Sequence, residues 1–186
     1  MNKDLVVVNL LGTSGVGKSR LASAIFSKMV NIPYTVELIS EVAKQMVWEQ
    51  CASHHFENQV KISAEQYSKQ LYLRQNNIDI CITDSPLILG MLHKPDPYFE
   101  YYEPLLFEMF NSFTNINFLI QRSDFKYDQK GRNETLEESN KKQDALIQLL
   151  QDHEINYRPV TNISVSSTAN NIAFQVLQTI QELRSL

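Results

Sequence analysis

The sequence contains a full match to the pattern G-x-x-x-x-G-K-[ST], at Gly12-Thr13-Ser14-Gly15-Val16-Gly17-Lys18-Ser19. Glycines permit backbone conformations that a Cβ atom forbids, so successive N–H groups can converge on phosphate oxygens. We expect the Lys18 amine to reach the β- and γ-phosphates of ATP, and the Ser19 hydroxyl to ligate Mg²⁺. All eight residues are therefore predicted to bind nucleotide, and Lys18 is also predicted to be catalytic.

Two carboxylates follow predicted strands and are candidates for the chemistry. Asp84 comes directly after the apolar run ICIT, where we predict a catalytic contact with Mg²⁺ through water; capping of a helix before Ser85-Pro86 is the alternative. Glu41 follows the run YTVELI and Ser40. We predict that it orients an acceptor hydroxyl and accepts its proton, the alternative being a first-turn carboxylate favoured by the helix dipole. Glu37 is a weaker candidate for the same role.

Basic residues gather after the fourth predicted strand. Arg122 follows that strand, and Arg132 follows Gly131 in a charged stretch. We predict a lid-like segment over residues 122–134, in which Arg122 and Arg132 neutralise charge on the transferred phosphoryl group and water is excluded. The alternative is a solvated surface loop.

Five runs rich in apolar residues alternate with helical patterns, which predicts an α/β fold with a parallel sheet and right-handed crossovers. We expect a P-loop NTPase fold with strand order 2-3-1-4-5 and helices on both faces, so that the strand before Asp84 lies beside the strand before Gly12. The predicted strands are residues 5–11, 34–39, 78–83, 116–121 and 157–165. The predicted helices are residues 20–30, 41–50, 63–75 (capped by Ser63), 87–92, 98–113, 135–153 and 169–186. Trp48 and most aromatic side chains of 98–113 are expected in the core.

The chain has 186 residues, of which 43% are hydrophobic and 20% charged, with a net charge of −4. This composition predicts one globular domain over residues 1–186, and the acidic balance argues against a protein that coats nucleic acid electrostatically. Cys81 lies in an apolar run and is expected in the core. No apolar stretch approaches the roughly 20 residues that span a bilayer, so we expect no membrane association and a cytoplasmic protein.

Motifs after the phosphate-binding loop help to distinguish the possible classes of reaction. Asn140-Lys141 is followed by Lys142-Gln143, which does not match the N/T-K-x-D motif with which GTPases read guanine. Motor ATPases usually place a Glu directly after the strand-end Asp, but here Ser85 follows Asp84. These absences favour phosphoryl transfer to a bound hydroxyl over hydrolysis.

Several segments occur together in one order: EVAK at 41–44 with Val47-Trp48-Glu49, Asp84-Ser85-Pro86-Leu87, and Gln121-Arg122 with Gly131-Arg132-Asn133. With the GTSGVGKS loop, they resemble the phage-encoded P-loop kinases of the AAA-like small-kinase group, which includes nicotinamide riboside kinase domains. Within that group the chain is most similar to the 5-hydroxymethyluracil DNA kinases.

This resemblance implies a magnesium-dependent kinase that transfers the γ-phosphoryl group of ATP to the 5-hydroxymethyl group of modified phage DNA, in the host cytoplasm. It places Lys18 and Ser19 on ATP and Mg²⁺, Asp84 on the metal, Glu41 on the acceptor, and Arg122 and Arg132 in the lid. A nucleoside or nucleotide acceptor such as nicotinamide riboside stays open, as does a partner-dependent P-loop ATPase. The oligomeric state and the preference for ATP over other nucleotides also stay open.

Overall fold

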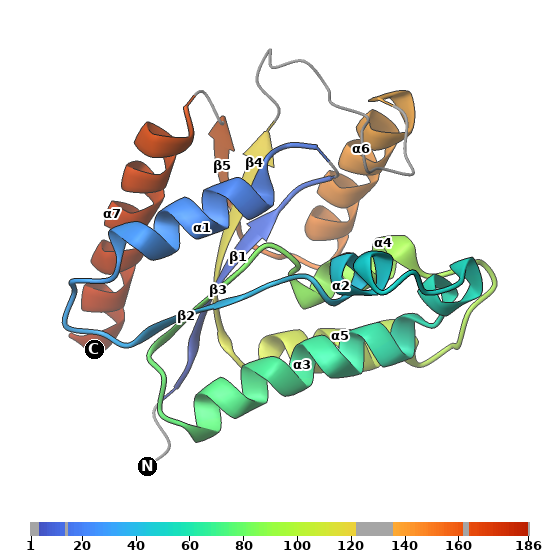
Figure 1. Ribbon diagram of the computed structural model, residues 1–186, viewed down its shortest axis with the longest axis horizontal. Coiled ribbons are helices and arrows are strands. Elements are labelled where there is room, and N and C mark those ends of the chain that lie inside the picture. The colour runs from blue at the N-terminus through green and yellow to red at the C-terminus, as the bar shows by residue number, and fades with distance from the viewer. Residues whose placement is uncertain (1–3, 14, 122–135, 162–163, 186) are drawn as a thin grey trace.

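A five-stranded parallel sheet forms the centre of the protein, in a computed structural model that describes residues 4–13, 15–121, 136–161 and 164–185. Its strand order is β2-β3-β1-β4-β5, which confirms the predicted fold (Figure 1). The strands are β1 (Val6–Leu11), β2 (Val36–Ile39), β3 (Ile80–Thr83), β4 (Thr114–Gln121) and β5 (Arg158–Thr161).

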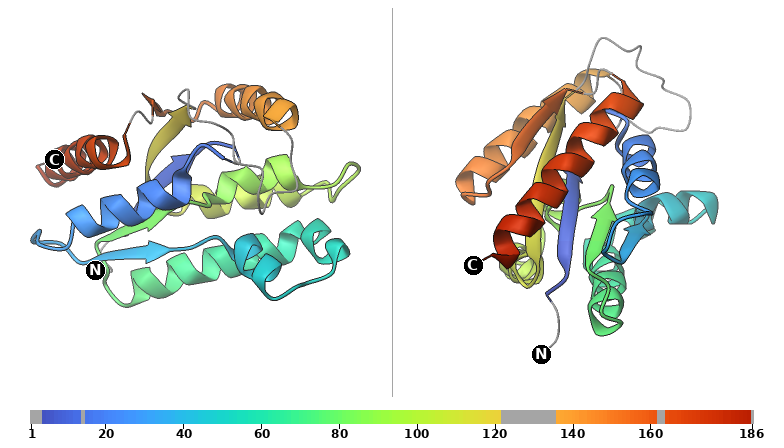
Figure 2. Two further views of the ribbon diagram at one scale, coloured as in Figure 1. Left: turned by 45° about the horizontal axis from the view of Figure 1, so that its top comes forward. Right: turned by 90° about the vertical axis from the view of Figure 1, so that its left-hand side faces the viewer.

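Helices cover both faces of the sheet, as Figures 1 and 2 show. On one face lie α1 (Lys18–Lys28) and α7 (Val165–Arg184); on the other lie α3 (Gln59–Gln75), α5 (Tyr102–Asn111) and α6 (Leu136–Asp152). The shorter elements are α2 (Val42–Trp48), the 3₁₀ helices η1 (Ser53–Glu57) and η2 (Leu87–Leu89), and α4 (Gly90–His93).

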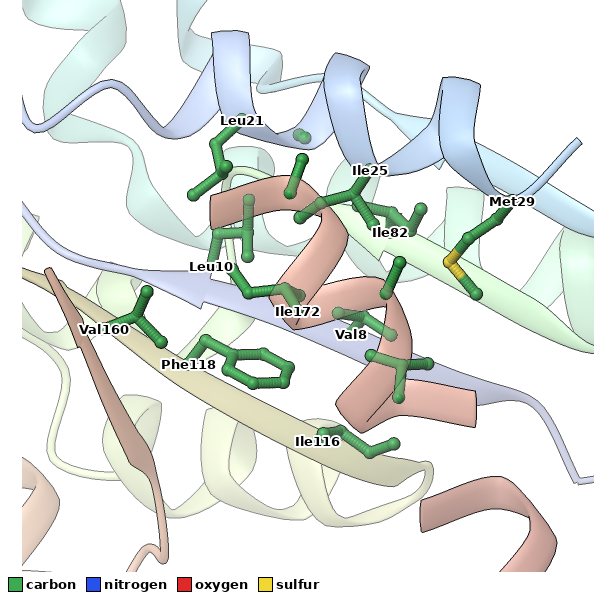
Figure 3. Close-up of a cluster of buried hydrophobic side chains, with 14 of the residues drawn as sticks. Val8, Leu10, Leu21, Ile25, Met29, Ile82, Ile116, Phe118, Val160 and Ile172 are labelled. Carbon is green, nitrogen blue, oxygen red and sulfur yellow. The ribbon is translucent and has the colours of Figure 1, made fainter. Parts of the chain in front are cut away.

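Strand β1 is buried on both sides, as its continuous apolar run predicts. Val8 and Leu10 pack with Leu21 and Ile25 of α1 and with Ile172 of α7 in one core cluster (Figure 3). The alternating residues of β1 belong to a second cluster, on the side of α5 and α6. The sheet therefore has a core on each face, and the ends of its central strands are held rigidly in place.

The polar residue within β1, Asn9, joins two strands through its amide nitrogen. Asn9 is buried, and its Nδ2 donates hydrogen bonds to the Oδ1 atoms of Asn115 and Asn117 at 2.8 and 2.9 Å. Both partners lie on β4, so this ladder ties β1 to β4 within the sheet.

Helix α3 begins at Gln59, four residues before the predicted start. Asn58 caps it, with its Oδ1 accepting the Lys61 N–H at 3.1 Å. The prediction of Ser63 as the cap is therefore wrong: Ser63 is buried inside the helix, and its hydroxyl lies 2.8 Å from that of Tyr102.

The burial of several aromatic side chains also differs from expectation. Trp48 is 78% exposed, so its prediction as a core residue is wrong: only Val42 and Met46 of the short helix α2 are buried. The helix expected from residue 98 begins at Tyr102, and Phe99 and Tyr101 before it are exposed, whereas Phe110 is in the core as expected.

Strand β5 ends at Thr161, before the predicted end at residue 165, and α7 begins at Val165, four residues before the predicted start at residue 169. Among the residues that the structure describes, no helix is both long enough and apolar enough to cross a membrane.

Candidate active site

The phosphate-binding loop connects the end of β1 at Leu11 to the start of α1 at Lys18. Gly17 is the residue before the helix and has φ 91°, a left-handed conformation that side chains with a Cβ rarely adopt. Gly12 has φ 145°, and a Cβ atom there would lie 3.0 Å from the Ile120 carbonyl oxygen. The sequence therefore forms the predicted loop at the amino end of a helix, where backbone N–H groups and the helix dipole favour an anion.

The Lys18 side chain turns back over this loop. Its Nζ donates hydrogen bonds to the carbonyl oxygens of Gly12 at 2.6 Å and Thr13 at 2.9 Å. Ser19 follows in the first turn of α1, so its hydroxyl belongs to the same loop–helix junction. Ser14 is outside the described residues.

Helix α6 also contacts the loop, through a residue that the sequence patterns do not identify. The Thr13 backbone N–H donates a hydrogen bond to Gln143 Oε1 at 3.2 Å. The two residues are 130 positions apart, and no local motif marks Gln143.

Asp84 directly follows β3, the neighbour of β1. Because Asn9 and Thr83 are register partners, Asp84 is level with Leu10, just before the loop. Its side chain is buried, and Oδ1 has no hydrogen-bond partner among the described residues. The helix-cap alternative is not observed, since Pro86 occupies the cap position of η2 and no side chain caps it.

A buried carboxylate oxygen without a donor is unfavourable unless a cation or ligand completes it. The Asp84 carboxylate and the Ser19 hydroxyl are hard oxygen donors of the kind that Mg²⁺ takes. The described residues contain no cluster of three or more His, Cys, Asp or Glu side chains that could hold a metal. A single carboxylate beside a hydroxyl suits Mg²⁺, which is usually bound through one or two carboxylates together with substrate phosphates.

Glu41 lies at the same edge of the sheet, on the chain that leaves β2. Ile39 is the register partner of Thr83, so Glu41 and Asp84 follow neighbouring strands. Glu41 is half-buried and occupies the residue before α2, without capping that helix. Glu37, the weaker candidate, is exposed within β2.

Arg122, Arg132 and the predicted lid over residues 122–134 lie outside the described residues, and their roles stay predictions. The described chain reaches this segment from Gln121 at the end of β4. Leu119 of β4 is the register partner of Leu11, so β4 ends at the loop edge of the sheet.

The buried face of α3 is polar beside this edge, a feature that the sequence patterns do not predict. Its buried residues are Gln59, Ser63, Gln66 and Gln70. Gln66 Nε2 donates to Thr83 Oγ1 at 3.2 Å, and that oxygen also accepts the Ser85 N–H at 3.1 Å. Gln66 Oε1 and Asn9 Oδ1 are, with Asp84 Oδ1, the buried side-chain oxygens for which the described part of the chain provides no partner.

Other titratable groups near the sheet are structural. Burial raises the pKa of the Tyr102 phenol to about 12, so it stays protonated at neutral pH. Cys81 is fully buried in the second core cluster, as predicted. Burial, reinforced by the Glu37 carboxylate, raises the pKa of its thiol far above the ordinary value, so Cys81 is a poor nucleophile.

Comparisons with known proteins agree with this architecture. The model of the AAA_28 family, described as an AAA domain, matches residues 7–167. The crystal structure of APE1195 is 13% identical with a TM-score of 0.54, covering 97% of this chain and 98% of its own. Thymidylate kinase from Ehrlichia chaffeensis is 13% identical with a TM-score of 0.56, covering 95% of this chain and 99% of its own. At this identity the two structures show a shared fold, and no curated protein sequence matches.

Proposed function

We propose that this chain, which belongs to the AAA_28 family of AAA domains, is a kinase that transfers the γ-phosphoryl group of ATP to an acceptor hydroxyl. The observation that carries the proposal is the pairing of a formed phosphate-binding loop with a buried, incompletely bonded Asp84 at the end of the adjacent strand. The loop groups phosphate-binding donors, and Asp84 provides an oxygen ligand at the same edge of the sheet.

The residues divide the work of phosphoryl transfer. The amides at the start of α1 and the Lys18 amine bind the β- and γ-phosphates, while Ser19 and Asp84 hold Mg²⁺. The metal, when bound, neutralises charge on the phosphate oxygens. Glu41 orients the acceptor hydroxyl and accepts its proton as the bond from oxygen to the γ-phosphorus forms and the bond to the ADP oxygen breaks. Arg122 and Arg132 would stabilise the charge on the transferred group.

The residue after Asp84 favours transfer over hydrolysis. That residue is Ser85, whose N–H is used to bond Thr83 Oγ1, so no carboxylate stands there to polarise water. The partner-dependent ATPase therefore receives no support from this part of the site.

For the acceptor, we propose the 5-hydroxymethyl group of 5-hydroxymethyluracil in phage DNA. The segments EVAK, TDSPL and GRN support it through their resemblance to DNA kinases of that type. A free nucleoside or nucleotide, nicotinamide riboside included, is the second candidate. It is favoured by a fold shared with a thymidylate kinase over 95% of this chain.

The test incubates the protein with γ-labelled ATP and Mg²⁺ beside four acceptors: DNA containing 5-hydroxymethyluracil, unmodified DNA, a deoxynucleoside mixture, and nicotinamide riboside. We expect label in the modified DNA alone, and none with the Lys18→Ala variant. Label in a nucleoside would refute the DNA acceptor but would support the proposal that the protein is a kinase. Release of free phosphate with every acceptor would refute the kinase proposal.

A further inference from the structure

The peptide unit between Gly12 and Thr13 is held from two sides. Its carbonyl oxygen accepts a hydrogen bond from Lys18 Nζ at 2.6 Å, and its N–H donates to Gln143 Oε1 at 3.2 Å. In a trans peptide the C=O and N–H point in opposite directions. Lys18 and Gln143 of α6 therefore form hydrogen bonds with opposite edges of the same peptide plane.

An exchange of the C=O and N–H directions of this peptide would change ψ of Gly12 and φ of Thr13. Gly12 has no Cβ atom, so no side chain opposes that exchange on the Gly12 side. After such a rotation an N–H would face the Lys18 ammonium in place of the carbonyl, and Lys18 would lose its shorter anchoring bond. The hydrogen bond to Gln143 opposes the rotation, because it is available in one orientation only.

We propose that Gln143 is a positioning residue that fixes the Gly12–Thr13 peptide, thereby holds Lys18 over the phosphate site, and ties nucleotide affinity to the placement of α6. This inference rests on the proposed binding of ATP at the loop. Gln143 is half-buried and reaches the loop from the core-packed helix that also contributes Leu146 and Leu150 to the second core cluster. It acts through the peptide and needs no contact with ATP.

The test uses the full chain and the Gln143→Met variant, which keeps the length of the side chain and removes the acceptor oxygen. The matched control is Gln148→Met, on the same helix, where the exposed Gln148 bonds Asp152 within the helix. Two quantities are measured for each protein: the Kd for ATP with Mg²⁺, and the rate at which Lys18 is acylated by an amine-reactive reagent without nucleotide, followed by mass spectrometry against Lys61.

We expect Gln143→Met to raise the Kd for ATP about five-fold, the worth of one net hydrogen bond, and to speed acylation of Lys18, while Gln148→Met changes neither. A purely structural role would lower the melting temperature and leave the relative acylation rate of Lys18 unchanged, and that result would overturn the inference. A wild-type chain that binds no ATP would instead refute the proposed function, on which the inference depends.

Discussion

Two aspartates flank the same strand, and their surroundings differ. Asp79 precedes β3 and Asp84 follows it, and both are buried, at 4% and 5% exposure. Asp79 Oδ1 lies 2.7 Å from Arg184 Nη2, and its Oδ2 accepts hydrogen bonds from Thr35 N–H at 2.9 Å and Thr35 Oγ1 at 2.8 Å. Asp84 Oδ1 has no partner within the described ranges.

The difference distinguishes an amino edge that these contacts stabilise from a carboxyl edge at which we propose that ligands bind. At the amino edge, Arg184 also lies 4.5 Å from the centre of the Tyr34 ring, so the end of α7, the start of β2 and the start of β3 are tied together. At the carboxyl edge, Asp84 Oδ1 is buried without a hydrogen-bond partner among the described residues, which has an energetic cost. A cost of this kind is expected where a ligand completes the site.

The variant with the largest expected effect removes the contacts of Asp79 at the amino edge. Asp79→Ala removes the partner of Arg184 and the one oxygen, Oδ2, that accepts both hydrogen bonds from Thr35. We expect the free energy of unfolding to fall by about 3 kcal/mol, near the lower end for a broken buried pair because Arg184 is partly exposed. Chemical denaturation measures it. Asp79 lies at the far end of β3 from the loop, so the Kd for ATP of the folded protein should not change; a selective loss of ATP binding would contradict the division of the two edges.

A substitution at the carboxyl edge should have the opposite effect, lowering activity and leaving stability nearly unchanged. Asp84→Asn preserves the shape of the side chain and removes its charge. We expect the rate of phosphoryl transfer to fall about 100-fold, as for the loss of support to a metal site, while the free energy of unfolding stays nearly unchanged, since Oδ1 has no hydrogen bond among the described residues to lose. Time courses with γ-labelled ATP measure the rate of phosphoryl transfer, and chemical denaturation measures the free energy of unfolding. A marked loss of stability with normal transfer would show that Asp84 is a structural residue like Asp79.

The sequence predicts the position of the carboxyl edge because that edge depends on local patterns, whereas the contacts of Asp79 at the amino edge join residues 44 and 105 positions apart. The runs before Asp84 and Gly12 are short, apolar and continuous, which is typical of buried parallel strands, and the Gly-rich loop has a fixed spacing. Register then brings Asp84 level with the loop, since strands of one sheet are aligned by their hydrogen bonds. The loop and the two carboxylates are therefore within reach of sequence reasoning.

The features that escape prediction depend on distant contacts. Gln143 reaches Thr13 across 130 positions, and a glutamine in a polar helix has no pattern of its own. The prediction for Trp48 fails because the pattern of α2 cannot show that the helix is too short to bury more than one side. The buried polar face of α3 depends on the pairing of Gln66 with Thr83 and of Ser63 with Tyr102, which only the fold creates.

Removing the exposed Trp48 side chain has the smallest expected effect of these variants. It tests whether the acceptor, too, binds at the carboxyl edge. Trp48 ends the helix that begins after Glu41, and with Val47 it leaves a large apolar surface exposed at 78% and 51%. An exposed indole adds little to stability, so Trp48→Ala should change the free energy of unfolding by no more than about 0.5 kcal/mol. A base stacked on it would be worth at least about 1 kcal/mol, so we expect the KM for a DNA acceptor to rise about five-fold and the KM for ATP to stay constant.

Two further variants make this result specific. Trp48→Phe keeps a ring on which a base can stack and should retain most of the acceptor affinity. Tyr72→Ala removes another exposed aromatic, 66% accessible, from the last turns of α3, near the amino edge where Asn76 and Ile78 lead into β3. If the carboxyl edge alone binds the acceptor, Tyr72→Ala leaves both KM values unchanged. An equal rise in the acceptor KM for Trp48→Ala and Tyr72→Ala would mean that the acceptor contacts both edges, and the separation between a binding edge and a stabilising edge would fail.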